Sequence, residues 1–524
     1  MIQTDLIASI PELIRRQEAK HPTKLAYADG RSSVTYGELA VTTGNLAGNL
    51  QSLGIEPGDR IAMLVPNSVE WVQSCLAIAR AGAVSVPISY DSALPEISYR
   101  LTDAGCKALI TTDDQAAKLD SVLAEARSVA HVILIDRGAR SAQGPRFVEL
   151  VGKPPKTPPR DPDMLYEPAF IVYTSGTTGR AKGVLLSVHG MLWVTAACWA
   201  PVVKLSAEDN VLSPLPLFHS YALNLSVLSI LATGASERIV ERYSTQEVAA
   251  LLGSGRYTVM PGVPTMFHYL LEAGRSNGVT RFPGLRLCIS AGAIMPAALN
   301  EAFERQFDVP LLDGYGITET STMVTMNWLG ASRVPGSCGI PVPGLAVRIV
   351  DGVNGEDVPL GDEGELIVRG PNLMLGYHDQ PEATANALRN GWYHTGDLAR
   401  SDRNGLLTIT GRVKELIIRG GQNIAPAEVE AAVGTHPAVL DCAVIGAPHE
   451  KLGEVPVVFV VAKTGTGIDA AGLIAHCKTQ LSAYKVPAEV HLIDAIPRTG
   501  SGKIMRYKLR EGLVQERADV AKGT

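Results

Sequence analysis

The sequence predicts an α/β fold: a large N-terminal domain of α/β sheets that includes a β-rich subdomain, followed by a small α+β C-terminal domain. Apolar runs typical of buried strands alternate with helix-like segments over the first part of the chain. From about residue 345 the pattern changes to short strands separated by turns, and strands mix with helices again from about residue 414. The chain has 524 residues, more than one compact core accommodates, so we expect several domains.

The elements expected in the first domain alternate between strand and helix. Residues 8–20 place apolar Ile10, Leu13 and Ile14 among charged residues, which predicts a surface helix. A connection rich in Pro, Arg and Gly is expected to be exposed over 138–163. The buried elements expected are strands at 60–65, 83–87, 108–111 and 169–172, and a helix at 69–81 that Gly82 ends.

Later segments predict two smaller parts. Short strands at 346–350 and 364–369 indicate a β-rich subdomain of about residues 345–410. The remaining residues are enough for a small α+β domain. Its expected elements are strands at 416–418 and 457–461 and helices at 426–433 and 470–481.

Composition and charge exclude several classes of protein. A formal net charge of −6 gives no reason to expect a nucleic-acid partner. The seven cysteines are odd in number and lack CxxC spacing, which favours reduced thiols in a cytoplasmic protein. We expect no signal peptide and no membrane span, because the longest apolar run, 223–235, falls short of the roughly 18 residues that a span needs.

The segment from Tyr173 to Gly183 combines hydroxyl side chains, glycines and one lysine directly after an expected strand. Glycines let the backbone approach a ligand closely, and consecutive N–H groups in such a loop form a concave anion site. The segment therefore predicts a polyphosphate site, although a solvent-exposed turn between two strands would have the same composition. The candidate phosphate-binding residues are Thr174, Ser175, Gly176, Thr177, Thr178 and Lys182.

A Walker A loop does not fit this segment, because that motif requires a contiguous Gly-Lys-Ser/Thr. Two residues separate Gly179 from Lys182. A second candidate, Gly500–Lys503, is followed by Ile504 and has Pro497 in place of the first glycine. The sequence therefore argues against a P-loop NTPase.

Five further segments combine turn glycines with charged or aromatic side chains. Taken alone each is a weak signal, because Asp397 also fits a turn, Lys503 a solvated lysine and Glu319 a surface residue. The segments are Asp313–Glu319, Gly391–Asp397, Gly411–Glu415, Gly420–Ile424 and Pro497–Lys503.

Together and in this order, the six motifs resemble those of the adenylate-forming superfamily, which comprises acyl-CoA synthetases, adenylation domains of peptide synthetases, and firefly luciferase. The resemblance extends over about residues 10–510 and is closest to bacterial fatty-acid and aryl-acid CoA ligases. It implies that ATP, Mg²⁺ and coenzyme A are used to activate a carboxylic acid through an acyl-adenylate. It also implies an AMP-binding domain over 1–410, a hinge at 411–414 and a mobile C-terminal domain over 415–524.

The resemblance implies a nucleotide site in the N-terminal domain. The loop 174–182 would hold the β- and γ-phosphates, and Tyr315 would stack on adenine. Thr318 would contact the α-phosphate, and Glu319 would bind Mg²⁺ together with Thr174. Further nucleotide-binding residues implied are Gly292, Ala293, Asp313 and Gly314.

The later motifs would complete the site by the same resemblance. Asp397 would take the ribose hydroxyls with help from Arg412, and Lys414 would be the hinge residue. Lys503 would bridge the carboxylate and the α-phosphate during adenylation. The pantetheine tunnel used in thioester formation would be lined by Gly420 and Gly421. These roles suit the chemistry, because electrostatic groups stabilise the charge on the α-phosphoryl oxygens and no nucleophilic side chain is required.

The residues around the expected acid pocket favour an apolar acid. His219 is placed by the resemblance at the pocket entrance, where it counts among the catalytic candidates, although a packed core histidine fits equally well. No Asp or Glu occurs over 211–225, so an α-ammonium group would have no counter-charge there. Asn224 could bind a polar substituent or be structural. Fatty or aryl acids are therefore favoured over α-amino and dicarboxylic acids; the small or apolar residues are Ser290–Ala293, Ile317, Met323 and Val324.

Two alternatives stay open. A stand-alone adenylation enzyme would use the same residues to load a carboxylic or β-amino acid onto an acyl carrier protein. A non-catalytic nucleotide-binding or scaffold protein would be signalled by loss of Glu319, Asp397 or Lys503, and all three are present. We expect a monomer or homodimer.

Overall fold

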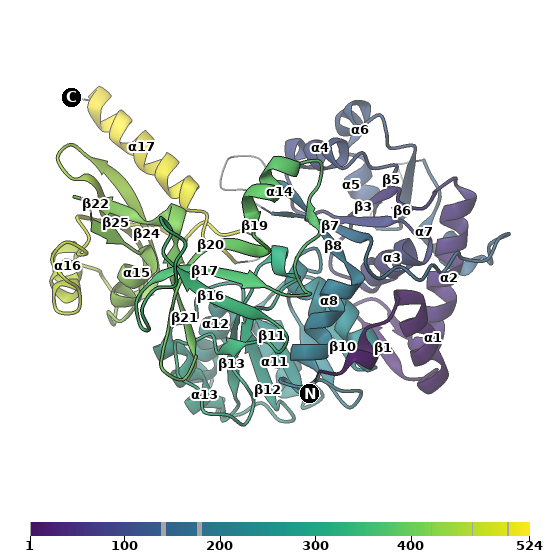
Figure 1. Cartoon of the computed structure of the whole chain (residues 1–524), viewed down its shortest axis with the longest axis horizontal. Helices are drawn as coiled ribbons and strands as arrows, with labels where there is room; N and C mark the ends of the chain where they lie inside the picture. Colours follow the sequence, from purple (N-terminus) through teal and green to yellow (C-terminus); the bar gives the residue numbers. More distant parts are fainter. Residues whose placement is uncertain are drawn as a thin grey trace. The chain divides into compact units, whose positions relative to one another are not determined.

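The computed structural model describes residues 2–137, 143–174, 181–420, 422–463, 465–499 and 502–523, the last six of these by their backbone alone (Figure 1). The predicted α/β fold is confirmed: a large N-terminal part is followed by a smaller C-terminal part. The chain divides into two compact units. The first comprises Met1–Ala346 and Arg369–Tyr393, and the second Val347–Val368 and His394–Thr524. The division at residues 410–415 implied by the motifs stays a prediction.

The first unit contains a nine-stranded sheet whose strands run mostly parallel. Its strand order is β15-β14-β13-β12-β11-β9-β10-β1-β2. The carboxyl ends of β11, β12 and β13 therefore meet at one edge of the sheet, where open α/β sheets bind ligands. Its strands are β1 (Leu25–Ala28), β2 (Ser33–Thr35), β9 (Asn210–Ser213), β10 (Ser236–Ile239), β11 (Val259–Gly262), β12 (Leu287–Ser290), β13 (Leu311–Tyr315), β14 (Thr325–Met326) and β15 (Ile340–Pro341).

A seven-stranded sheet in the same unit has the order β18-β8-β7-β4-β3-β5-β6. Its central strands are parallel, whereas β8 is antiparallel to both β7 and β18. The strands predicted at 60–65, 83–87, 108–111 and 169–172 are confirmed as members of this sheet. They are β3 (Arg60–Leu64), β4 (Val84–Pro87), β5 (Ala108–Thr112) and β7 (Pro168–Thr174), beside β6 (His131–Ile135), β8 (Lys182–Ser187) and β18 (Gly376–Tyr377).

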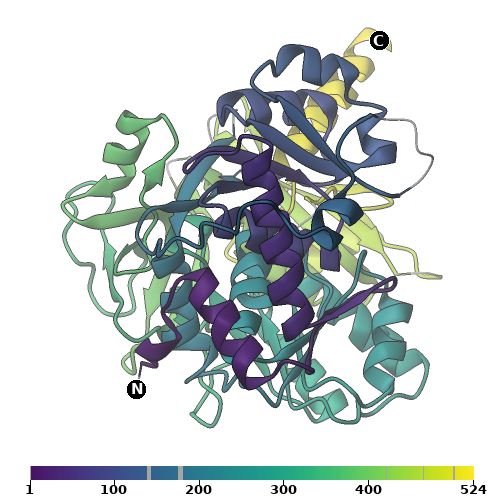
Figure 2. The same cartoon turned by 90° about the vertical axis from the view of Figure 1, so that its right-hand side faces the viewer.

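Helices cover both faces of the seven-stranded sheet, as the alternating side chains of β3 show. Ile61 and Met63 pack in the cluster formed with α2 and α3, whereas Ala62 and Leu64 pack with α4 and α6 (Figure 1). In Figure 2, α1 and α2, drawn in purple, face the viewer. The helices named so far are α1 (Ile10–Lys20), α2 (Tyr36–Ser52), α3 (Val69–Arg80), α4 (Leu94–Asp103) and α6 (Asp120–Glu125).

The first unit contains further helices. The predicted helices at 8–20 and 69–81 are confirmed as α1 and α3. The remaining helices are η1 (Thr4–Leu6), α5 (Asp113–Ala116), α7 (Phe147–Gly152), α8 (Val188–Val194), η2 (Thr195–Trp199), α9 (Ser220–Ala222), η3 (Leu223–Ser229), α10 (Ile230–Thr233), α11 (Thr245–Gly253), α12 (Pro264–Ser276), α13 (Ala297–Phe307), η4 (Thr318–Thr320) and α14 (Pro381–Ala387), with the short strand β19 (Leu388–Arg389) after α14.

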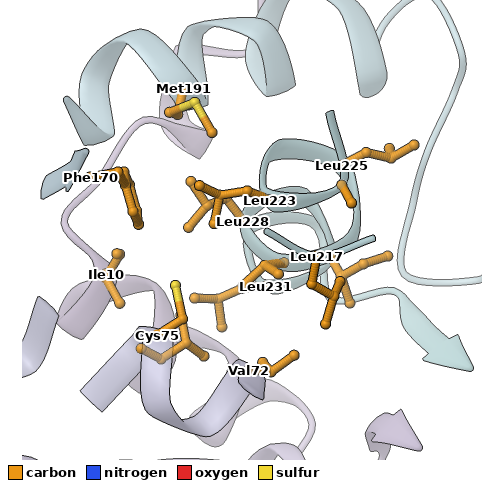
Figure 3. Packing of buried hydrophobic residues seen from close by; sticks show 14 of the residues in the cluster. Ile10, Val72, Cys75, Phe170, Met191, Leu217, Leu223, Leu225, Leu228 and Leu231 are labelled. Carbon is orange, nitrogen blue, oxygen red and sulfur yellow. The ribbon is translucent and has the colours of Figure 1, made fainter. Parts of the chain in front are cut away.

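The apolar run 223–235 forms part of the core. Its residues build η3, which is a π-helix, and α10. Figure 3 shows Leu228 and Leu231 directed toward Ile10 of α1 and Cys75 of α3, and all four side chains are buried. In the described part of the chain no helix is long and apolar enough to cross a membrane.

The expectation of an exposed connection over 138–163 is wrong for its central part. Residues 147–152 form α7, and Phe147 is buried. Asn45 and Asn49 of α2 each donate a side-chain hydrogen bond to a carbonyl at the end of α7, at 2.9 and 2.8 Å. The six-residue helix is too short to show a helical period, which explains why composition alone suggested a loop.

The second unit combines β-rich segments with an α+β part. The strands predicted at 346–350 and 364–369 are confirmed, and β20 pairs with β21. In the α+β part the sheet order is β23-β22-β25-β24, with β26 beside β25. The elements are β16 (Ala346–Val350), β17 (Gly364–Arg369), β20 (Trp392–Ser401), β21 (Leu407–Arg412), η5 (Val413–Glu415), β22 (Ile417–Arg419), β23 (Gln422–Ile424), α15 (Pro426–Gly434), β24 (Val439–His449), β25 (Gly453–Ala462), α16 (Ala470–Lys478), β26 (Glu489–Leu492) and α17 (Arg506–Gly523).

All seven cysteines are free thiols. Six are buried, and Cys442 is half-buried. Burial raises the pKa of the Cys75 and Cys106 thiols to about 12, because a thiolate is poorly solvated in an apolar environment.

Glu237 is a fully buried carboxyl group in the nine-stranded sheet. It lies on β10 between Tyr27 of β1 and Val211 of β9. Burial raises the pKa of Glu237 well above the ordinary value. The nearby Ser226 hydroxyl lowers this pKa, but its effect is smaller than that of burial. The folded protein therefore holds this carboxyl in its neutral form at pH values where the unfolded chain ionises it.

This burial predicts that Glu237→Gln becomes more stable relative to the wild type as pH rises. A raised folded-state pKa gives stability that is complete below the unfolded pKa and is lost as pH rises toward the folded pKa. We expect the difference in unfolding free energy to grow by about 1.4 kcal/mol per pH unit above pH 5. Denaturant titrations at pH 5, 6, 7 and 8 measure it, with exposed Glu208→Gln as control. A difference that stays constant over this range would contradict the burial argument.

Candidate active site

The two ends of the candidate phosphate loop are fixed by the β7–β8 hairpin. Thr174 ends β7 and Lys182 begins β8, and the two residues are paired in register. Both side chains are half-buried. The other predicted phosphate-binding residues, Ser175, Gly176, Thr177 and Thr178, lie outside the described residues.

Helix α4 holds the backbone on both sides of this loop. The Tyr99 hydroxyl donates a hydrogen bond to the Ala181 carbonyl at 2.9 Å, one residue before Lys182. The Tyr173 hydroxyl, one residue before Thr174, donates to the Asp103 carboxylate at 2.6 Å. Burial and this acceptor raise the pKa of Tyr173, so the hydroxyl stays a donor. One helix thus fixes the entry and exit of the loop.

A second group of candidates lies at the carboxyl edge of the nine-stranded sheet. Ser290 at the end of β12 is paired with Asp313 of β13. Gly292 follows β12 with φ +88°, a conformation that residues with a side chain rarely adopt. Ala293 is exposed directly after it, and half-buried Tyr315 ends β13. The structure therefore brings the predicted adenine-binding segments together at one edge.

Asp313 is the most unusual carboxyl group of this edge. Its side chain is 7% exposed, and its Oδ1 atom has no hydrogen-bond partner among the described residues. Burial raises its pKa well above the ordinary value, although the N–H of Gly314 acts in the opposite direction. An unpaired buried acceptor is costly, so this oxygen suits a ligand that brings a hydrogen-bond donor, such as the exocyclic amine of adenine.

Thr318 and Glu319 lie in η4, directly after this edge. Gly316 before them allows no side chain, because an added Cβ would lie 1.4 Å from the Thr322 carbonyl oxygen. Thr318 is buried, and its hydroxyl lies 3.1 Å from that of Ser220. Glu319 is half-buried and accepts a hydrogen bond from the Tyr377 hydroxyl at 3.1 Å.

His219 and Asn224 have different surroundings. His219 is half-buried at the N-cap of α9, where its Nδ1 accepts a hydrogen bond from the Tyr221 N–H at 3.3 Å. Asn224 is fully buried and joins three segments: its Oδ1 accepts from Trp199, and its Nδ2 donates to backbone carbonyls at Met191 and Ser321. Of the two roles considered for Asn224, the structural one is therefore supported. The role of His219 stays a prediction.

In the second unit, Asp397 and Arg412 form an ion pair across adjacent strands. The residues are paired in register on β20 and β21, and Arg412 Nε lies 2.6 Å from Asp397 Oδ1. Asp397 is 3% exposed, and its N–H donates to the Thr395 hydroxyl at 3.0 Å. The predicted partnership of this carboxylate with Arg412 thus has a geometric basis.

The remaining candidates of this unit lie in a short helix and in turns. Lys414 is exposed in the middle of η5. Exposed Gly420 has φ +57°, and its N–H donates to the Leu452 carbonyl at 2.7 Å; Gly421 lies outside the described residues. Lys503 closes a tight turn in which its N–H donates to the Thr499 hydroxyl at 3.1 Å.

An ion pair anchors the turn that carries Lys503. Arg498 donates to both Asp441 oxygens of β24, at 2.8 and 2.9 Å, and to the Gly502 carbonyl at 2.9 Å. Arg498 and Ile504 form an antiparallel bridge across the turn. The lysine therefore lies on a short hairpin whose base is fixed to the sheet.

Sequence reasoning missed Tyr99, Asp103, Tyr377 and Tyr393, which surround the predicted residues. Tyr393 lay within the segment Gly391–Asp397, but only the aspartate was assigned a role. The only signal for Tyr377 is a Gly-Tyr dipeptide, and for Tyr99 and Asp103 it is an ordinary helical pattern. Such positions become visible only once the chain is folded.

Comparison with known proteins decides the family. Residues 14–378 match the family described as AMP-binding enzyme, and residues 428–503 match the AMP-binding enzyme C-terminal domain. The chain belongs to this family. A feruloyl-CoA synthase of Amycolatopsis sp is 34% identical over 496 residues, which cover 94% of this chain and 97% of that protein.

Two further relatives of this AMP-binding enzyme support the assignment. A long-chain-fatty-acid–CoA ligase of Yersinia pestis is 33% identical over 542 residues, covering 97% of this chain and 95% of that protein. The crystal structure of the anthranilate CoA ligase AuaEII in complex with anthranoyl-AMP is 26% identical and has a TM-score of 0.90. The match covers 99% of this chain and 100% of that chain. The AMP-binding enzyme described here is thus an AMP-forming acyl-CoA synthetase, a class that uses ATP and coenzyme A with a carboxylic acid.

Proposed function

We propose that this acyl-CoA synthetase activates an aryl or fatty monocarboxylic acid. One observation carries the proposal: the segments expected to line the acid pocket contain no lysine or arginine, and no acidic residue occurs over 211–225. A second carboxylate or an ammonium group of the substrate would therefore be buried without a counter-charge. Buried Met323 and Val324 add apolar surface, and fully bonded Asn224 offers no free amide.

An aryl acid is the first candidate, and a fatty acid is the second. The feruloyl and anthranilate enzymes among the relatives favour the first, and the long-chain-fatty-acid enzyme favours the second. Coenzyme A is the acceptor in each of these relatives by name. Loading of a carrier protein is the alternative acceptor reaction.

The nucleotide is proposed to bind at the edge formed by β12, β13 and η4. Asp313 Oδ1 accepts from the adenine amine, Tyr315 stacks on the base, and Lys182 and the loop hold the β- and γ-phosphates. Attack of the substrate carboxylate on the α-phosphorus forms the acyl-adenylate and releases pyrophosphate. Thr318, and Lys503 from the second unit, stabilise the charge that develops on the α-phosphoryl oxygens.

The chain offers suitable ligands for Mg²⁺. Glu319 and Thr174 supply oxygen atoms, the donors that Mg²⁺ prefers. Within the described parts of the chain, no group of three or more His, Cys, Asp or Glu side chains could hold a metal ion. Mg²⁺ is usually held by one or two carboxylates together with substrate phosphates, so a lone glutamate beside a phosphate loop fits. When bound, the ion would neutralise phosphate charge.

An ATP–pyrophosphate exchange screen tests the proposed substrate class. The panel contains hydroxycinnamates, benzoates, fatty acids of 8–16 carbons, a dicarboxylic acid and an aromatic α-amino acid. We expect exchange with an aryl or fatty acid, followed by thioester formation with coenzyme A. Exchange confined to the dicarboxylic or α-amino acid would refute the acid assignment. A strong preference for a phosphopantetheinylated carrier protein over coenzyme A would establish the alternative acceptor.

The α4 contacts predict that Tyr99→Phe weakens ATP use specifically. The substitution removes the hydrogen bond to the Ala181 carbonyl, which is worth about 1 kcal/mol, and keeps the ring. We expect KM for ATP to rise about fivefold in the exchange assay, with KM for the acid unchanged. Tyr243→Phe, which removes a hydroxyl bonded to the Met266 carbonyl, is the control. An equal rise in both KM values would show that Tyr99 does not act through the loop.

A further inference from the structure

One tyrosine connects the candidate metal ligand to the loop lysine. The Tyr377 hydroxyl donates to Glu319 Oε1 at 3.1 Å, and Lys182 Nζ lies 4.7 Å from the centroid of the Tyr377 ring. Tyr377 is 9% exposed, and its partners Glu319 and Lys182 are half-buried. The hydroxyl of Tyr393, which is 4% exposed, lies 3.5 Å from that of Tyr377.

The backbone around Tyr377 fixes the ring in this place. Tyr377 pairs with Val184 of β8, two residues from Lys182. The N–H of Met374 donates to the Glu319 carbonyl at 2.8 Å, so the same segment also holds η4. The Thr384 hydroxyl of α14 accepts from the Tyr377 N–H at 2.9 Å. The ring is therefore attached to both elements that it connects.

The chemistry of each contact is selective. A carboxylate has two oxygens, and the hydrogen bond to Oε1 does not use Oε2 and restricts rotation of the group. A tyrosine hydroxyl keeps its proton near neutral pH, so Tyr377 donates this hydrogen bond to Glu319. The ring face attracts the ammonium group of Lys182, because its quadrupole is negative there.

We propose that Tyr377 is a positioning residue of adenylation, which orients the Glu319 carboxylate with its hydroxyl and the Lys182 ammonium with its ring. The inference rests on the proposed function, in which Glu319 meets the metal ion and Lys182 the phosphates. In this proposal Tyr377 contacts neither the substrate carboxylate nor the α-phosphorus. The hydroxyl of Tyr377 acts on the metal ligand and its ring acts on the phosphate-binding lysine, so different substitutions can remove one effect without the other.

Binding measurements on the full chain separate the two halves. Mn²⁺ replaces Mg²⁺, and the α,β-methylene analogue of ATP replaces the substrate, so that no turnover is needed. Free Mn²⁺ is measured by electron paramagnetic resonance in the presence of the protein and the analogue, and binding of the metal-free analogue is measured separately by calorimetry. The variants are Tyr377→Phe, which keeps the ring, and Tyr377→Leu, which removes it.

We expect Tyr377→Phe to weaken Mn²⁺ binding about tenfold or more and to change binding of the metal-free analogue less than twofold. Tyr377→Leu is expected to weaken the metal-free analogue as well, by about threefold or more. KM for the acid stays unchanged in Tyr377→Phe. Tyr243→Phe, with its hydroxyl bonded elsewhere, is the matched control and binds both ligands like the wild type.

Two results distinguish the possible failures. Wild-type Mn²⁺ affinity in a folded Tyr377→Phe overturns the inference, and so does equal weakening of metal and metal-free analogue, which indicates a general structural effect. Glu319→Gln tests the proposed function itself, and we expect it to weaken Mn²⁺ at least as much as Tyr377→Phe. If Glu319→Gln binds Mn²⁺ like the wild type, the metal assignment of Glu319 fails and the inference falls with it. Because Tyr377→Phe removes one oxygen atom, it keeps the test valid if Tyr377→Leu does not fold.

Discussion

Lys503→Ala is expected to slow acyl-adenylate formation by roughly a hundredfold or more, which corresponds to about 3 kcal/mol of lost transition-state stabilisation. Thioester formation from supplied acyl-adenylate should stay near the wild-type rate. The reason is that the ammonium group offsets charge only while the α-phosphate is being attacked. Pyrophosphate exchange measures the first half-reaction, and thioester release from synthetic acyl-adenylate and coenzyme A measures the second.

The hairpin beneath Lys503 makes this substitution interpretable. Its turn is held by backbone hydrogen bonds and by Arg498 on Asp441, none of which needs the lysine side chain. The variant should therefore fold like the wild type. Lys508→Ala, at an exposed position on α17, is the matched control and should leave both half-reactions intact. Equal loss of both half-reactions in folded Lys503→Ala would show that the lysine is not specific to adenylation.

Lys414→Pro is expected to leave adenylation active and to abolish thioester formation. In the mechanism that we propose, the C-terminal domain presents Lys503 in one half-reaction and Gly420 in the other, and these residues lie in separate turns about 80 residues apart. Proline fixes φ near −65° and disfavours helical values for the preceding Val413, so the segment could no longer change conformation. Lys414→Ala, which keeps the backbone freedom, is the control.

The two half-reactions have to be measured separately for this variant too. Single-turnover formation of acyl-AMP reports the first, and transfer to coenzyme A reports the second. Lys414 is exposed in the short helix η5, and circular dichroism checks that the effect of the proline on Val413 stays local to this helix. Wild-type rates in both half-reactions would place the hinge elsewhere or show that no such rotation is needed.

Parts of the fold with strong periodicity were predictable from the sequence. Strands such as β3 and β5 are short, mainly apolar runs, and α3 has an apolar face and ends before Gly82, which has φ +79°. Helix α7 was not predictable, because six residues carry too little pattern. The sequence also could not indicate which sheet each strand joins, since register depends on contacts far along the chain.

Some residues of the candidate site could likewise be predicted from the sequence, and others could not. Residues in glycine-containing motifs, such as Asp313 and Glu319, could be selected because the six motifs, taken together and in order, resemble those of a known family. Tyr99 and Tyr377 could not, because their contacts are with segments far away along the chain. Asn224 shows the reverse case: its polar side chain suggested a ligand, and the structure uses it to join η2, α8 and the turn after η4.

The burial of the cysteines has a practical consequence for an enzyme that consumes a thiol. Coenzyme A reacts as a thiolate, and the disulfide reagents that titrate it are attacked by thiolates in the same way. Six of the chain's seven cysteine side chains are buried, and one is half-buried. Burial also holds the Cys75 and Cys106 thiols in their unreactive, protonated form. The coenzyme A that remains can therefore be titrated with a chromogenic disulfide in samples taken from the reaction, with little contribution from the native protein, and oxidised coenzyme A should form little mixed disulfide with it.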